Sequence, residues 1–118
     1  MDTRIYMTVL IYLKEGQEAV FHEYERQAAK VMARHNGRFE QLIKPDTVNG
    51  DLPLPNEIHI LSFATSDGFA SYRQDPDSAA LAPMRIASVE KAIFLQGTAL
   101  SGWTLDGQSI FEIPLIAN

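Results

Sequence analysis

The chain has 118 residues, a formal net charge of −5 and no cysteine, and its length is that of one domain. The lack of cysteine removes disulfides, thiolate catalysis and cysteine metal sites. The negative charge argues against nonspecific nucleic-acid binding, which depends on cationic contacts to phosphate. No apolar run reaches the roughly 18 residues that a transmembrane helix needs, and no small-residue cleavage site follows the apolar N-terminal stretch. We therefore expect one cytoplasmic domain, 1–118, with neither a nucleic-acid nor a membrane partner.

The first predicted element is a strand at 4–14 that is apolar on both faces. Ile5, Met7, Val9, Ile11 and Leu13 alternate with Tyr6, Thr8, Leu10 and Tyr12, so neither face suits water. Helices of the same chain can cover one face. A chain of this length can hardly supply a second layer, so we expect a second subunit on the other face.

Helical and strand signals then alternate along the chain. The spacing predicts a helix over 17–36 that stops at Asn36–Gly37, because glycine accepts the left-handed conformation past a helix end. Strands are predicted at 38–45 and 57–64, joined by a long connection over 46–56. Thr65 or Ser66 can cap a helix that ends near Asp75–Pro76. A further helical piece around 78–88, interrupted at Pro83, precedes a strand at 89–96.

This order is strand, helix, strand, strand, helix, strand, which predicts an α+β fold of the ferredoxin-like βαββαβ type. Its four-stranded antiparallel sheet would carry helices on one face, and two sheets packed face to face would form a homodimer. The core is expected at 4–97. The C-terminal extension 98–118 contains the apolar run Ile110–Ile116, which we expect to form an added strand or arm.

Three stretches resemble a known family: IYMTVLIYL, the helix end Ala33–Phe39 (ARHNGRF), and the block from EIHILSF to AIFLQG. They are similar to the dimeric α/β-barrel family called domain of unknown function thirteen-thirty. The resemblance implies a ferredoxin-like fold and a homodimer, and it implies no agreed activity. The broader superfamily includes cofactor-independent monooxygenases, haem-degrading enzymes and lactone isomerases, among which a fold cannot choose.

Two histidines are predicted catalytic residues. His59 lies inside an apolar strand and needs a hydrogen-bond partner, for which Glu40, Tyr6 and Tyr12 on neighbouring strands are candidates. It would either transfer protons with a carboxylate or belong to a buried network that fixes strand register. His35, at the last turn of the long helix, would act as a general base or bind an anion; a histidine is also simply favoured at that position.

Other polar residues are assigned binding or structural roles. Tyr12, Arg85 and Glu40 are predicted to bind substrate. Arg85 would bind a carboxylate through a bidentate contact, and an ion pair with one of the chain's own acidic residues is an equally good interpretation. His22 lies at helical spacing from Glu18, Glu25 and Arg26, which is typical of a solvated surface cluster. The three histidines are 13 and 24 residues apart, and we predict no metal site and no cofactor.

Three functions are compatible with these observations. The first is a homodimer that binds a small organic molecule in a pocket between sheet and helices. The second is a cofactor-independent monooxygenase or isomerase acting on a small aromatic or lactone-like substrate. The third is a non-catalytic, structural dimer. A buried histidine–carboxylate pair that opens into a cavity would favour the second.

Overall fold

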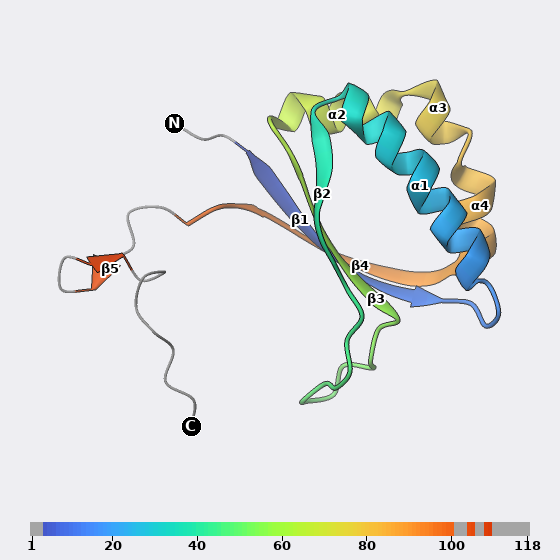
Figure 1. Cartoon of the computed structure of the whole chain (residues 1–118), viewed down its shortest axis with the longest axis horizontal. Helices are drawn as coiled ribbons and strands as arrows, with labels where there is room; N and C mark the ends of the chain where they lie inside the picture. Colours follow the sequence, from blue (N-terminus) through green and yellow to red (C-terminus); the bar gives the residue numbers. More distant parts are fainter. Residues whose placement is uncertain (1–3, 101–103, 106–107, 110–118) are drawn as a thin grey trace.

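The computed structural model describes residues 4–100, 104–105 and 108–109. The main elements are β1 (Ile5–Leu13), α1 (Glu18–Arg34), β2 (Gly37–Ile43), β3 (Glu57–Phe63), α2 (Ser66–Gln74), α3 (Pro76–Ala79), α4 (Ala82–Ser88) and β4 (Val89–Thr98). The strands form one antiparallel sheet in the order β2-β3-β1-β4, and the helices lie together on one face of it (Figure 1). This is the predicted ferredoxin-like arrangement.

The core lies between α1 and the central strand β1. On β1 every second residue is buried, from Ile5 to Leu13, and these side chains pack against Phe21 and Met32 of α1 and Phe63 of β3. Phe63 is fully buried. Because paired residues of neighbouring strands point to the same face, the register Val9↔His59 places His59 on this helix-covered face.

The turn after α1 ends the helix in a different way from the prediction. Asn36, not Gly37, takes the left-handed conformation, with φ of 60°, which asparagine tolerates better than most residues. Gly37 is instead needed for space, because a Cβ atom there would lie 2.4 Å from Cε1 of Phe63. The absence of a side chain at position 37 lets the Phe63 ring pack against the backbone of β2.

The helices between β3 and β4 are three short segments. Thr65 caps α2 as predicted, since its hydroxyl accepts a hydrogen bond from the Gly68 N–H. The prediction that Pro83 interrupts a helix is wrong. Pro83 lies in the first turn of α4, where its missing N–H costs no hydrogen bond.

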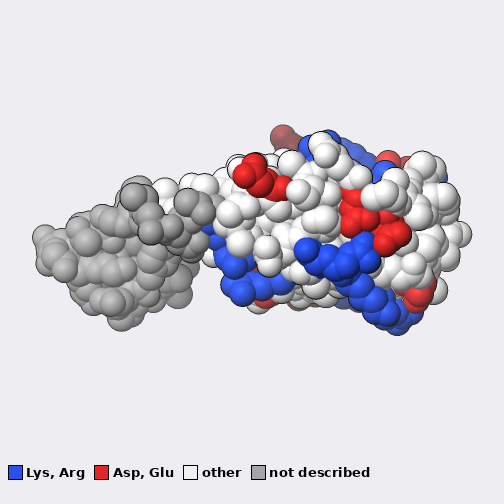
Figure 2. Space-filling view, turned by 90° about the horizontal axis from the view of Figure 1, so that it is seen from above, with Lys and Arg blue, Asp and Glu red and all other residues white. Residues whose placement is uncertain are grey.

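The two faces of the molecule differ in polarity. On the helical side, basic and acidic side chains are interspersed (Figure 2), and Arg34 pairs with both Asp75 and Asp77. The opposite, open face of the sheet carries apolar side chains of three strands. They are Leu10 of β1, Ile58 and Ile60 of β3, and Ile93 and Leu95 of β4.

The C-terminal part contributes two short strands, β5 (Thr104–Leu105) and β6 (Gln108–Ser109), which pair with each other. The predicted strand at Ile110–Ile116 lies outside the described residues. Within the described residues, no helix is long and apolar enough to cross a membrane.

Candidate functional site

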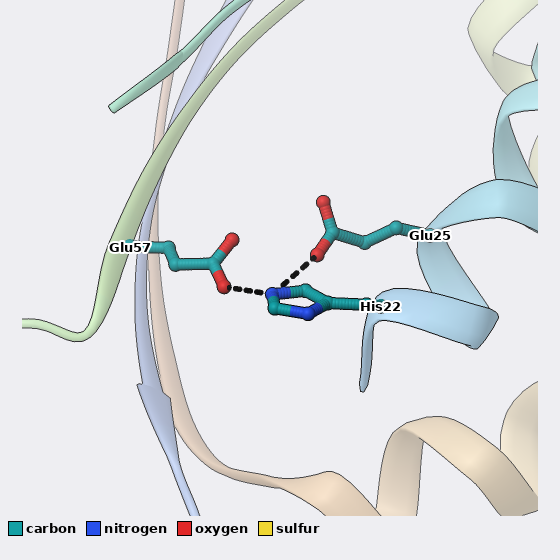
Figure 3. A group of neighbouring side chains, drawn as sticks. All are labelled: His22, Glu25 and Glu57. Atoms are coloured by element: carbon teal, nitrogen blue, oxygen red, sulfur yellow. Dashed lines mark hydrogen bonds and ion pairs between the residues drawn. The ribbon is translucent and has the colours of Figure 1, made fainter. Parts of the chain in front are cut away.

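Three polar side chains meet between α1 and the start of β3 (Figure 3). His22 and Glu25 lie three residues apart on α1 and point toward Glu57, the first residue of β3. The His22 Nε2 atom is 2.7 Å from Glu57 Oε2 and 4.0 Å from Glu25 Oε1. Glu25 is buried, whereas the side chain of His22 is half exposed. The buried carboxyl group of Glu25 therefore lies close to the carboxyl group of Glu57, with His22 beside both.

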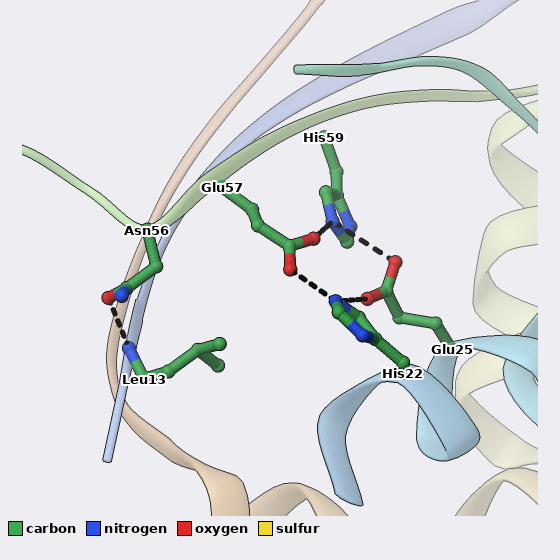
Figure 4. Close-up of polar contacts among 6 residues, drawn as sticks. All are labelled: Leu13, His22, Glu25, Asn56, Glu57 and His59. Carbon is green, nitrogen blue, oxygen red and sulfur yellow. Dashed lines mark hydrogen bonds and ion pairs between the residues drawn. The ribbon is translucent and has the colours of Figure 1, made fainter. Parts of the chain in front are cut away.

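Asn56 fixes the start of β3 and so the position of Glu57 (Figure 4). The Asn56 N–H donates to the Ile11 carbonyl, and its Oδ1 accepts from the Leu13 N–H, both at 2.8 Å. This side chain extends the β1–β3 ladder by one step beyond the strand. Alternation along β3 then directs both Glu57 and His59 toward the helices.

His59 links the two carboxylates. Its Nε2 atom lies 2.8 Å from Glu57 Oε1 and 3.1 Å from Glu25 Oε2 (Figure 4). Its ring packs between Phe21 and Phe39, with centroid distances of 5.7 and 5.6 Å. Among the described residues, none forms a hydrogen bond with Nδ1 of His59. A neutral ring with its proton on Nε2 donates to Glu57 Oε1, has Glu25 Oε2 beside it at 3.1 Å, and keeps a lone pair on Nδ1.

The surroundings of Glu25, Glu57 and His59 shift the pKa of each group. Burial, together with the charge of Glu57, raises the pKa of Glu25 to about 8. Burial lowers the pKa of His59, although Glu57 partly opposes this. Burial acts to raise the pKa of Glu57, but the hydrogen bonds from His59 and His22 have the larger combined effect. The pKa of Glu57 is therefore below its usual value. Near neutral pH the free protein therefore holds one ionised and one protonated carboxyl group around a neutral imidazole.

A cavity of about 820 Å³ lies between the sheet and the helices, and His59 and Glu25 are part of its wall. This volume is in the range of small-molecule sites. Most of the lining is apolar or aromatic and comes from β1, α1, β3, α2 and β4. Examples are Val9, Phe21, Leu61, Phe69, Tyr72 and Phe94.

A second polar region of the same cavity surrounds Tyr72. Burial raises the pKa of Tyr72 to about 12, to which Tyr24 also contributes, while Ser78 and the charge of Arg85 act in the opposite direction. Tyr24, Tyr72, Ser78 and Arg85 all line the cavity. The predicted substrate-binding residue Arg85 is thus at the cavity, near the Tyr72 hydroxyl.

The other predicted site residues lie away from this cavity. His35 follows α1 and pairs with Asp75, with 2.7 Å between Nε2 and Oδ2. Tyr12 is on the open face of the sheet, where its hydroxyl donates to the Pro53 carbonyl. Glu40 accepts hydrogen bonds from Ser62 and Arg38. The structure brings His59 and Arg85 to one cavity and does not bring His35, Tyr12 or Glu40 there.

Sequence reasoning missed the partners of His59. The predicted candidates were Glu40, Tyr6 and Tyr12, whereas Nε2 of His59 is hydrogen-bonded to Glu57 and lies 3.1 Å from Glu25. Two signals were present: Glu57 and His59 alternate on one face of an apolar strand, and Glu25 follows Phe21 by one helical turn on the buried side of α1. His22 was assigned to a surface cluster, yet it bonds across to β3.

Fold and site together define a ferredoxin-like α+β protein with a histidine–carboxylate cluster in the wall of a cavity. No protein-family model and no curated protein matches the chain. The resemblance to domain of unknown function thirteen-thirty therefore stays a prediction.

Solved structures to which the chain is similar share its fold. A protein of unknown function from Rhodopseudomonas palustris has a TM-score of 0.74 and 16% identity, over 86% of this chain and 85% of that one. A DABB family protein with a ferredoxin-like fold from Mesorhizobium loti has a TM-score of 0.63 and 20% identity, over 83% of this chain and 98% of that one. SnoaB, a cofactor-independent oxygenase from Streptomyces nogalater, has a TM-score of 0.62 and 15% identity, over 86% of this chain and 97% of that one. At these identities the similarity shows the ferredoxin-like fold.

Proposed function

We propose that this protein binds a small organic molecule in the cavity and removes a proton from it, with His59 as the base. The observation that carries the proposal is a buried histidine in the wall of a largely apolar cavity, hydrogen-bonded to Glu57 and 3.1 Å from the carboxyl group of Glu25. A positioned imidazole is the commonest general base in enzymes. Binding without catalysis needs no such cluster, so its presence favours an enzyme over a simple carrier.

The geometry gives each group a role in the reaction. Glu57 accepts the Nε2–H of His59 and so orients the ring, while Glu25 Oε2 lies 3.1 Å from the same nitrogen. This leaves Nδ1 to take the proton. The proton would come from a carbon next to a carbonyl group or from a phenolic oxygen, and an enolate or phenolate would remain. Return of the proton to another carbon completes an isomerisation. Attack of molecular oxygen on the anion would begin an oxygenation, the activity named for the similar SnoaB protein.

Deuterium exchange tests this function without knowledge of the product. The purified chain is incubated in deuterated buffer with a panel of β-diketones, lactones and hydroxylated aromatic ketones, and exchange at each acidic carbon is followed by NMR. We expect accelerated exchange for molecules that fit the cavity. Exchange at the uncatalysed rate for every member of the panel would contradict the proposal.

We also propose that the protein is a homodimer in which two open sheet faces pack together. The support is a group of apolar side chains on the open face, Leu10, Ile58, Ile60, Ile93 and Leu95, of which Leu95 is 57% exposed. Such a contiguous apolar surface is typical of an interaction site.

The dimer is tested by replacing Leu95 with glutamate, which would place a charge in the packed interface. Sedimentation should show a dimer for the wild type and a monomer for the L95E variant. The L52E variant, at another exposed leucine in the connection between β2 and β3, controls for the added charge. A wild-type protein that is already a stable monomer at sub-micromolar concentration would refute the dimer.

A further inference from the structure

We propose that His22, Glu25 and Glu57, here called the metal triad, bind one divalent transition-metal ion at the edge of the cavity. One ligand atom from each residue lies within 4.8 Å of the other two. The three side chains converge from α1 and β3 on a common point (Figure 3). Nothing in the sequence spacing predicts this site, because Glu57 is 32 residues from Glu25 in the chain and only the fold brings them together.

An unsatisfied oxygen of Glu25 is the second observation that points to an ion. Glu25 Oε1 is buried and has no hydrogen-bond partner among the described residues, although buried polar atoms are nearly always bonded. It points toward His22, whose Nε2 is 4.0 Å away. A cation between Glu25, His22 and Glu57 would satisfy this oxygen.

The separations in the metal triad suit a small ion after modest side-chain movement. In a tetrahedral zinc site with bonds of about 2.0–2.2 Å, ligand atoms are roughly 3.4 Å apart. Here the Nε2 atom of His22 is 2.7 Å from one carboxylate oxygen and 4.0 Å from the other. A small displacement of the half-exposed His22 would equalise the two distances.

His59 supplies the outer support that metal-bound carboxylates require. Each carboxylate of the metal triad turns one oxygen toward His22 and the other toward His59, at 2.8 Å for Glu57 and 3.1 Å for Glu25. Hydrogen bonds of this kind fix the orientation of metal ligands. The contacts of His59 with Glu57 and Glu25 therefore orient the His59 ring and also fix the carboxyl groups in position to bind an ion.

The chemistry of the metal triad selects the class of ion. Two carboxylates balance a charge of two, and an imidazole nitrogen favours zinc, iron, nickel or copper over magnesium or calcium. Three protein ligands leave a coordination position for water or substrate, as in catalytic zinc sites. Glu25 lines the cavity, so an ion there would polarise the oxygen of a molecule from which His59 removes a proton; this role rests on the proposed function.

Metal binding is tested on the full chain after dialysis against a chelator. Zinc is titrated by calorimetry and cobalt by visible absorption, with H22Q and E25Q as ligand variants and E15Q, at an exposed loop glutamate, as the control. We expect one ion per chain for the wild type and E15Q, and at least a tenfold loss of affinity in both ligand variants. Because His22 is half exposed, H22Q should fold even if E25Q does not. No saturable binding, or binding unchanged in H22Q, would overturn the inference.

The same experiment separates the metal site from the proposed function. Suppose that the chain binds neither zinc nor cobalt and still catalyses deuterium exchange at the full rate in the presence of chelator. That result would overturn the metal site and leave the proton-transfer function standing. Saturable binding that H22Q removes would support the metal site even if no molecule of the panel exchanges.

Discussion

Replacement of His59 by glutamine should lower the rate of enzyme-catalysed deuterium exchange by roughly 10²–10⁴-fold, the usual contribution of a positioned acid or base. Glutamine can still donate a hydrogen bond toward Glu57 and Glu25, but it cannot take a proton. The loss should therefore appear mainly in kcat, with KM changed much less. Exchange is measured by NMR under saturating and limiting substrate, and folding of the variant is checked by circular dichroism.

A second histidine variant separates the two catalytic candidates. His35 is bonded to Asp75 outside the cavity, so we assign the base to His59 and not to His35. Loss of exchange in H35Q with full activity in H59Q would reverse that assignment. The E15Q variant, which changes an exposed loop residue, sets the baseline for both.

Truncation of Phe63 to alanine should destabilise the fold by about 3–5 kcal/mol, the usual cost of removing a buried phenylalanine ring. Phe63 is fully buried and packs against Phe69 and Tyr72, with ring centroids 5.3 and 5.4 Å away. Its loss would leave a cavity where β3 meets α2. Urea unfolding gives the free energy, and F63L serves as a milder variant if F63A does not fold.

Gly37 and Phe63 should behave as a coupled pair. Because a Cβ atom at position 37 would lie 2.4 Å from the Phe63 ring, G37A alone should cost about 1–3 kcal/mol through overpacking. In the F63L or F63A background the same substitution should cost clearly less, because the ring is gone. G97A is the control, since nothing lies within 4 Å of a Cβ there. Equal costs of G37A in both backgrounds would show that the close approach is not what requires glycine.

Much of the fold could be predicted because local signals agreed with the final packing. The two apolar faces of β1 indicated that both needed cover, and the three- and four-residue spacing of apolar residues predicted the helix that the structure shows as α1. The prediction for Pro83 was wrong because proline can either break a helix in its interior or occupy the first turn of a new helix. Only the fold shows that a new helix begins there.

The site was harder to predict because its groups come from separate elements. His59 was singled out as a histidine within an apolar strand, and the structure places it at the cavity. Its carboxylate partners depend on strand register and on how α1 crosses the sheet, and neither is encoded in short spacings. Glu25 looked like part of a solvated helix face, yet the crossing of α1 buries it against β3.

The measurement that tests the central claim most directly is nitrogen-15 NMR of the His59 ring in metal-free protein at neutral pH. We predict a neutral ring with its proton on Nε2, held by Glu57, and an unprotonated Nδ1 whose signal shifts when a cavity ligand binds. A ring protonated on Nδ1, or one whose signals ignore every cavity ligand, would contradict the assignment of His59 as the base.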